Sequence, residues 1–262
     1  MKAIHSVGIV GLGLIGGSMA RSIKKHTIAT VYGYDLDPEA MALATDAGAI
    51  DAPLTRETLQ ECDILLIAIA PRSLVKWVED HADAIPTTTI LVDLCGVKRY
   101  IYKHIAPLAR ENGFLYVGGH PMAGKEVSGF ANSDRELYRD ASMILCPDES
   151  ADEESIDTLK ALKEIFPDDE FYLLIGADNW AAWDRWKSAE EIVRNHHVLV
   201  YPRMGYQVDI PSELAHHVAL IDAPVIEISS TQVRSMLAAD EIPAFYLPDD
   251  VLNYAIRHSI YR

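Results

Sequence analysis

A glycine turn between an apolar run and a helical pattern constrains this chain more than any other feature. The turn has the sequence Gly-Leu-Gly-Leu-Ile-Gly over residues 11–16, after the β-prone run at 7–10 and before a helical pattern at 18–23. In a strand–turn–helix unit the first glycine permits the tight turn, the second lets a diphosphate approach the backbone, and the third lets the helix pack close to the strand. The N–H groups that begin such a helix attract anions. The predicted dinucleotide ligands are Gly11, Leu12, Gly13, Leu14, Ile15 and Gly16, and the alternative is a purely structural turn.

An acidic residue stands where a ribose-binding carboxylate belongs. The next predicted strand, at 30–34, ends in Asp35, about twenty residues after the turn. A carboxylate there accepts hydrogen bonds from a ribose 2′-hydroxyl and repels a 2′-phosphate. Asp35 therefore predicts NAD rather than NADP as the cofactor, and the alternative is a solvated side chain.

Composition limits the classes of partner. The 262 residues carry a formal net charge of −16, which argues against nucleic acid and anionic membranes. The three cysteines, Cys62, Cys95 and Cys146, are widely spaced, so we expect neither a metal site nor a disulfide framework. That cysteine usage, the lack of a signal-peptide pattern and the lack of a long apolar run favour a cytoplasmic protein.

Strand patterns alternate with helix patterns along the whole chain. Apolar runs such as 64–69 predict strands that are buried on both faces, and amphipathic stretches follow them. This order predicts an α/β fold with a doubly wound parallel sheet and helices on both faces. The acidic, turn-like stretch at 148–154 marks a seam, so the predicted domains are residues 1–154 and 155–262.

Two further motifs follow predicted strands of the first domain. One is Asp-Leu-Cys-Gly-Val-Lys at 93–98, and the other begins Gly-Gly-His-Pro-Met-Ala-Gly at 118–124 and continues through Ser128. Ligands of open α/β sheets gather at the carboxyl ends of strands, so His120 could take a hydroxyl proton beside a nicotinamide. From the same motifs we expect Asp93 at the cofactor, and Lys98 and Ser128 at substrate or a second nucleotide. The alternative for His120 is a loop histidine bonded to backbone.

Residues 1 to about 165 resemble the nucleotide-binding domain of the prephenate dehydrogenase family. The resemblance rests on the glycine turn with its following Gly-Ser and on His-Pro-Met-Ala-Gly-Lys-Glu-Val-Ser-Gly-Phe at 120–130. It implies a Rossmann-type fold, NAD, and oxidative decarboxylation of prephenate to 4-hydroxyphenylpyruvate in tyrosine biosynthesis. It also implies that His120 polarises the substrate hydroxyl and accepts its proton.

The chain departs from that family in two places. Many members carry a serine where this chain has Gly96, and Cys95 before it is expected to be a packed side chain rather than a nucleophile. The family continues into an all-helical domain that forms the dimer and supplies an arginine to the substrate. Nothing after residue 165 has that pattern, so we expect weak or absent turnover.

The second half has motifs of its own. Tryptophans at 180, 183 and 186 follow a predicted strand, and Ser229, Ser230, Thr231 and Arg234 lie at a predicted helix start. Without further context, tryptophans at helical spacing favour a core, and the hydroxyls favour an ordinary helix cap.

Residues 155–262 resemble the C-terminal half of bacterial nicotinate-nucleotide adenylyltransferase. The resemblance implies a nucleotidyltransferase-type α/β segment in which Asp178 and Trp180 hold a nicotinate nucleotide. It also implies that Ser229, Ser230, Thr231 and Arg234 hold ATP phosphates. The family's phosphate-stabilising His-x-Gly-His does not occur in this sequence.

Three functions therefore stay open. The first is an NAD-dependent oxidoreductase acting on a prephenate-like small molecule, the second is adenylyl transfer with ATP and nicotinate mononucleotide, and the third is a non-catalytic NAD-binding chimera. The sequence does not decide between prephenate and arogenate, between a natural and an engineered join, or between a monomer and a homo-oligomer.

Overall fold

The computed structural model describes most of the first 223 residues and part of the remainder. Described are residues 4–139, 141–146, 162–165, 170–186, 189–223, 230–239, 252 and 256–257. Its internal contacts divide the chain into two compact units, Met1–Ile221 and Asp222–Arg262. The predicted domain boundary at residues 154 and 155 lies outside the described residues and stays a prediction.

Strands and helices alternate through the first unit, as the sequence predicts. The strands are β1 (Ser6–Val10), β2 (Thr30–Tyr34), β3 (Ala52–Pro53), β4 (Ile64–Ile67), β5 (Ile90–Asp93), β6 (Leu115–Pro121), β7 (Ser142–Cys146), β8 (Glu170–Gly176), β9 (His197–Tyr201) and β10 (Val218–Leu220). The α-helices are α1 (Leu14–His26), α2 (Pro38–Asp46), α3 (Arg56–Leu59), α4 (Pro71–His81), α5 (Arg99–Asn112), α7 (Ala177–Trp180) and α8 (Ala189–Asn195). Short 3-10 helices are η1 (Ala82–Ala84), η2 (Phe130–Asn132) and η3 (Trp183–Arg185).

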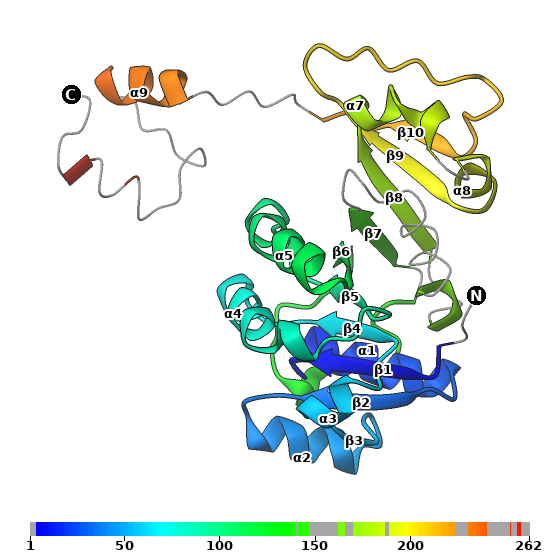
Figure 1. Cartoon of the computed structure of the whole chain (residues 1–262), viewed down its shortest axis with the longest axis vertical. Helices are drawn as coiled ribbons and strands as arrows, with labels where there is room; N and C mark the ends of the chain where they lie inside the picture. The colour runs from blue at the N-terminus through cyan, green and yellow to red at the C-terminus, as the bar shows by residue number, and fades with distance from the viewer. Residues whose placement is uncertain are drawn as a thin grey trace. The chain divides into compact units, whose positions relative to one another are not determined.

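All these strands form one mixed sheet (Figure 1). Their order is β10-β9-β8-β7-β6-β5-β4-β1-β2-β3, and the neighbours pair in parallel except for β6 and β7. The predicted parallel sheet is therefore confirmed with one antiparallel pair. The segment between β6 and β7 contains only η2 among its described residues, not the crossover helix that a parallel return needs. Strand β8 pairs with β7, so it extends the same sheet.

Both faces of the sheet are covered in the first half of the unit. In β4, Ile64 and Leu66 pack into the core that contains α1 and α2, whereas Leu65 and Ile67 pack into the core that contains α4 and α5. This alternation explains the uninterrupted apolar run of that strand, because every side chain in it has a buried environment.

Strands β7 to β9 alternate more strongly between buried and half-buried residues. In β8, Phe171, Leu173 and Ile175 are buried, whereas Tyr172 and Leu174 between them are half-buried. Strands β7 and β9 show the same alternation. One face of this part of the sheet is therefore more densely covered than the other.

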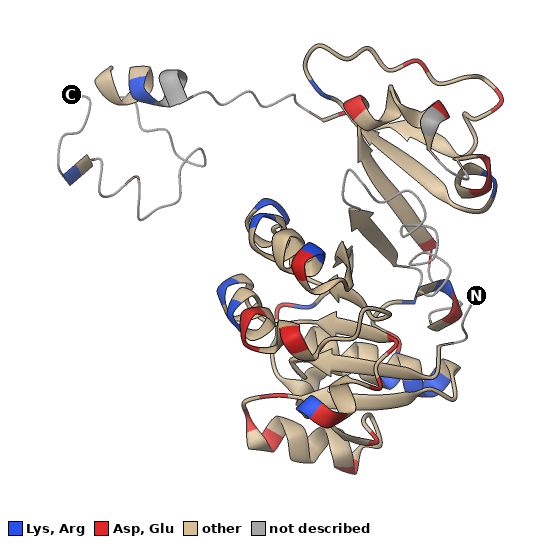
Figure 2. Ribbon diagram, in the orientation of Figure 1, with Lys and Arg blue, Asp and Glu red and all other residues tan. Residues whose placement is uncertain are grey.

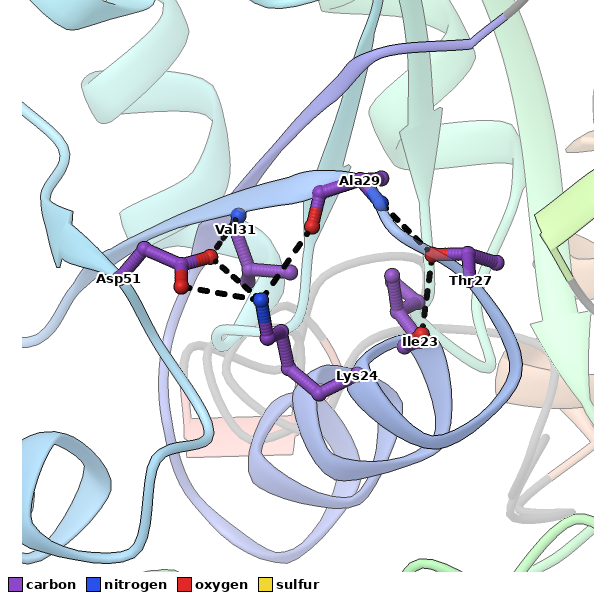
Figure 3. Close-up of polar contacts among 6 residues, drawn as sticks. All are labelled: Ile23, Lys24, Thr27, Ala29, Val31 and Asp51. Atoms are coloured by element: carbon purple, nitrogen blue, oxygen red, sulfur yellow. Dashed lines mark hydrogen bonds and ion pairs between the residues drawn. The ribbon is translucent and has the colours of Figure 1, made fainter.

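The end of α1 is tied to the neighbouring strands by one cation (Figure 3). The Lys24 ammonium lies 2.9 Å from the Asp51 carboxylate, and the other role of that carboxylate is to accept a hydrogen bond of 2.8 Å from the Val31 N–H. Thr27 ends the helix by donating its hydroxyl to the Ile23 carbonyl. These contacts hold the C-terminal end of α1 against β2.

The second unit contributes α9 (Ser230–Ala238), in which Leu237 is buried. The sequence pattern at 248–258 also predicts a helix, and most of that range lies outside the described residues. Among the helices that the structure describes, none combines the length and apolar character needed to cross a bilayer.

Candidate functional site

The glycine turn connects β1 to α1 with the backbone that the sequence predicts. Gly11 has φ +90°, and a Cβ on it would lie 2.5 Å from Ile69 Cγ2 and 2.7 Å from the Ala68 carbonyl oxygen. The Gly11 N–H donates to the Tyr34 carbonyl at 2.7 Å. Both the left-handed backbone and the close approach of the two residues after β4 therefore require glycine at this position.

The other two glycines differ in what a side chain would meet. A Cβ on Gly16 would lie 1.8 Å from the Gly11 carbonyl oxygen, so the helix packs directly against the turn. A Cβ on Gly13 would meet no heavy atom of the protein within 4 Å. Gly13 is also the N-cap of α1 and supplies no side-chain cap, which leaves the first-turn N–H groups available to an anion.

Asp35 lies at the end of β2 and braces the turn from the side. Its Oδ2 accepts from the Leu12 N–H at 2.7 Å, and its Oδ1 accepts from the Asp37 N–H at 2.9 Å. Each oxygen keeps a second lone pair, so the carboxylate can still accept from a ribose. Sequence reasoning missed the bracing role, although the nearness of a strand-end carboxylate to a glycine turn is a usable signal for it.

A pocket of about 520 Å³ opens beside Asp35. Its wall combines the strand ends with α4, which contributes Arg72 and Lys76. Figure 2 shows both basic (blue) and acidic (red) positions on this helix. The lining residues are Gly11, Tyr34, Asp35, Leu36, Ile69, Arg72, Ser73, Lys76, Trp77, Asp80 and His81. The Trp77 and His81 rings stack at 4.2 Å, so one wall is aromatic. This pocket has the size and mixed lining of a small-ligand site.

Asp93 ends β5 and is completely buried. Its carboxylate accepts from the Tyr116 hydroxyl at 2.8 Å and the Cys95 N–H at 3.1 Å, and it forms an ion pair with Lys98. Lys98 also donates to the Gly119 carbonyl at 2.5 Å. Burial raises the pKa of Asp93, and the Lys98 ammonium and the Tyr116 hydroxyl oppose that rise. The predicted site residues Asp93 and Lys98 are thus brought together, and Tyr116 joins them without having been predicted.

His120 lies within β6 rather than in the loop after it. The strand continues to Pro121 because Gly118–Pro121 pair with β7, and His120 is opposite Ile144. Its Nδ1 is buried and has no hydrogen-bond partner among the described residues. A Cβ on Gly96 would lie 3.7 Å from His120 Cε1, so the Gly96 position is directly beside the imidazole.

Two other residues of these motifs, Cys95 and Ser128, differ in exposure. Cys95 is buried, its thiol donates to the Ile69 carbonyl at 3.2 Å, and burial raises its pKa to about 11. These properties favour a packed thiol over a nucleophile. Ser128 is exposed in the segment after β6, where its carbonyl accepts from the Asn132 amide at 2.7 Å.

The C-terminal candidates fall in two places. Trp180 is buried, donates its indole N–H to the Asp209 carbonyl at 2.9 Å, and lies 5.3 Å from the Trp183 ring. Asp178 lies 3.0 Å from the Arg203 guanidinium. Ser229 is outside the described residues. Ser230, Thr231 and Arg234 belong to α9 of the second unit, and Arg234 is exposed there.

Comparison with known proteins gives two sets of relatives. A Bacteroides fragilis protein with the name "Probable nicotinate-nucleotide adenylyltransferase" is 42% identical over 105 residues, which are 40% of this chain and 52% of that protein. Prephenate dehydrogenase of Bacillus subtilis is 32% identical over 158 residues, which are 59% of this chain and 42% of that protein. The chain therefore spans about half the length of these curated relatives.

A solved structure and a family model agree with the second set. The structure of prephenate dehydrogenase from A. aeolicus, in complex with hydroxyphenyl propionate and NAD+, superposes with a TM-score of 0.57 and 26% identity. The match covers 66% of this chain and 60% of that one. The family model for the prephenate dehydrogenase nucleotide-binding domain matches residues 19–166, more than half of the chain. The chain belongs to the family of prephenate dehydrogenase nucleotide-binding domains.

Proposed function

We propose that this protein is an NAD-dependent oxidoreductase that acts on prephenate or a close relative of it. The observation that carries the proposal is that His120 and the glycine turn lie at the same edge of one sheet. Strands β1, β4, β5 and β6 are adjacent and parallel, so their carboxyl ends are aligned. With a strand spacing of about 4.8 Å, His120 lies roughly 14 Å along this edge from Gly11.

The glycine turn, the start of α1 and Asp35 would bind the dinucleotide. The open space at Gly13 and the first-turn N–H groups of α1 suit a diphosphate. Asp35, in the pocket beside α4, would accept hydrogen bonds from the hydroxyls of the adenosine ribose, and its charge disfavours a 2′-phosphate. The nicotinamide end would then extend along the sheet toward Asp93 and His120.

His120 performs the proton chemistry in this account. Its imidazole accepts the proton of the substrate hydroxyl, and the carbon that bears this hydroxyl loses a hydride. NAD+, when bound, would supply the hydride acceptor at its nicotinamide ring. The ring carboxyl leaves as carbon dioxide, and the electrons of the broken carbon–carbon bond move through the ring to the new carbonyl oxygen. That oxygen takes back a proton, which gives the phenol of 4-hydroxyphenylpyruvate.

We expect slow turnover because the described residues lack two groups that would assist the reaction, a hydroxyl beside His120 and an arginine from an all-helical domain. Gly96 offers no hydroxyl to the imidazole, and His120 Nδ1 lacks a partner among the described residues. The described residues after β7 form strands β8 to β10 with short helices in place of an all-helical domain. The described part of the chain therefore has no all-helical domain that could supply an arginine to the substrate carboxylate.

The direct test follows NADH formation at 340 nm on addition of prephenate, with arogenate in parallel. His120→Asn should abolish NADH formation and leave NAD+ affinity unchanged. His216→Asn is the matched control, because His216 is an exposed histidine outside the site. Equal rates for the wild type and His120→Asn would refute the role of His120. Silence of the wild type at high enzyme concentration would refute the activity.

Adenylyl transfer by the second half is a second candidate. It is favoured by the 42% identity to the named nicotinate-nucleotide adenylyltransferase and by the Asp178–Arg203 ion pair beside Trp180. The missing His-x-Gly-His argues against it. Pyrophosphate release from ATP and nicotinate mononucleotide would support transfer. NAD+ binding without either reaction would leave a non-catalytic binding protein.

A further inference from the structure

A buried polar cluster lies behind the candidate proton acceptor. The Asp93 carboxylate is wholly buried and is the common partner of the Lys98 ammonium and the Tyr116 hydroxyl. Tyr116 is itself buried within β6, four residues before His120, and its ring lies 6.4 Å from that of Tyr102. The cluster therefore connects the end of β5, the start of α5 and the strand that carries His120.

The cluster holds the peptide that immediately precedes His120. Lys98 donates to the Gly119 carbonyl at 2.5 Å while it pairs with Asp93. A Cβ on Gly118 would lie 3.0 Å from Lys98 Cδ and 3.5 Å from Asp93 Oδ2, so a side chain at this position would crowd the Lys98 side chain. The stem of Lys98 thus passes over the bare backbone of β6 to reach the carbonyl.

The imidazole itself has little other support. His120 Nδ1 has no hydrogen-bond partner among the described residues, and the neighbouring position is Gly96, which has no side chain. The direction of the ring consequently depends on where the backbone of β6 places it. A group that fixes the Gly119–His120 peptide therefore also fixes the imidazole.

The buried charge of Asp93 indicates that the cluster does more than stabilise the fold. Burial raises the pKa of Asp93 despite Lys98 and Tyr116, which means that the buried charge is costly at neutral pH. Burial and the nearby Asp93 charge also raise the pKa of Tyr116, so its hydroxyl remains a proton donor to that carboxylate. Costly buried charges of this kind occur often at functional sites.

We propose that Tyr116 is a positioning residue for His120, acting through Asp93 and Lys98 on the Gly119 carbonyl. The proposal rests on the proposed function of His120 as the proton acceptor. The Tyr116 hydroxyl is one of the donors that keep Asp93 ionised, and the ionised carboxylate holds the Lys98 ammonium in place. Loss of the hydroxyl weakens this hold and lets the peptide before His120 move.

Tyr116→Phe tests the proposal because it removes one oxygen and keeps the packed ring. A displacement of about 1 Å at a reacting group lowers turnover by roughly a hundredfold. We expect kcat to fall by about 10- to 100-fold, NAD+ affinity to stay within about twofold, and the acid limb of the kcat/KM pH profile to shift. Tyr102→Phe is the matched control, since its ring neighbours Tyr116 and its hydroxyl accepts from Arg110 at 3.3 Å rather than contacting Asp93.

A second measurement does not depend on turnover. In protein with 13C-labelled histidine, the His120 ring resonance is identified by its loss in His120→Asn. Tyr116→Phe should shift or broaden that resonance, and Tyr102→Phe should leave it unchanged. If the wild type turns nothing over, the proposed function fails, yet the shifted resonance still supports the positioning role. An unchanged resonance together with unchanged kcat and pH profile in Tyr116→Phe would overturn it, even if the melting temperature fell.

Discussion

Two glycines of the same turn should respond in opposite ways to one added methyl group. At Gly13 the backbone has φ −70° and ψ −155°, and an added Cβ would find no heavy atom within 4 Å. The free energy of unfolding of Gly13→Ala should therefore change by no more than about 0.5 kcal/mol. If a diphosphate occupies that space, the same methyl group should weaken NAD+ binding about a hundredfold, or by about 2.7 kcal/mol.

Gly16→Ala should instead damage the fold. Its Cβ would lie 1.8 Å from the Gly11 carbonyl oxygen, so the helix and the turn would have to separate by more than an ångström. Overpacking of this severity costs about 3 kcal/mol. For a chain of this size, that cost lowers the melting temperature by roughly 6–12 °C.

The assay compares thermal unfolding without ligand and calorimetric titration with NAD+ for the wild type and both variants. The account requires that Gly13→Ala melts like the wild type and binds poorly, and that Gly16→Ala melts early. Wild-type affinity in Gly13→Ala would refute the diphosphate site at the turn. A wild-type melting temperature in Gly16→Ala would refute the packing of α1 on Gly11.

Three further changes test other parts of the account. Gly96→Ser should place a hydroxyl beside His120 and raise kcat about tenfold, equal to ~1.4 kcal/mol, with NAD+ affinity unchanged; steady-state rates that do not rise would contradict this. Asp35→Asn should lower the ratio of NAD+ to NADP+ affinity, and an unchanged ratio in paired titrations would mean that Asp35 does not contact the ribose. Burial raises the pKa of Asp51, but the Val31 N–H and Lys24 lower it to a net value below 3.8. The stability from this carboxylate is therefore present above pH 3.8 and is lost as the pH falls through the lowered pKa. Asp51→Asn should cost no more than about 1 kcal/mol at pH 7, because the pair is partly exposed, and nothing in strong acid; a loss that persists in acid unfolding curves would contradict the assignment.

The sequence predicts much of the fold because its local signals agree with one another. The strand before Gly11, the glycine turn and α1 are confirmed, and Asp37 caps α2 by accepting from the Glu39 N–H at 3.0 Å. Such features depend on neighbouring residues alone. The antiparallel direction of β7 could not be predicted, because it depends on how the segment after β6 folds over α1.

The site is predicted less completely, because part of it depends on contacts between residues that are distant in the sequence. Asp35 follows β2, Asp93 ends β5 and His120 is the residue before the last of β6, so all three lie at the carboxyl edge of the sheet, where a local signal can find them. Tyr116 has the pattern of an ordinary buried strand residue. Its hydroxyl reaches Asp93 only because the strand register sets Asp93 opposite Gly118. A totally buried aspartate requires hydrogen-bond donors, so a search for them near Asp93 is the signal that could have found Tyr116.

Calorimetric titration of the unmodified protein with NAD+ shows whether the turn at residues 11–16 binds a dinucleotide. We expect saturable binding of one NAD+ per chain, weaker binding of NADP+, and competition between NAD+ and ADP-ribose. A titration without heat, together with crystals that show no density at the turn after soaking in NAD+, would contradict this expectation.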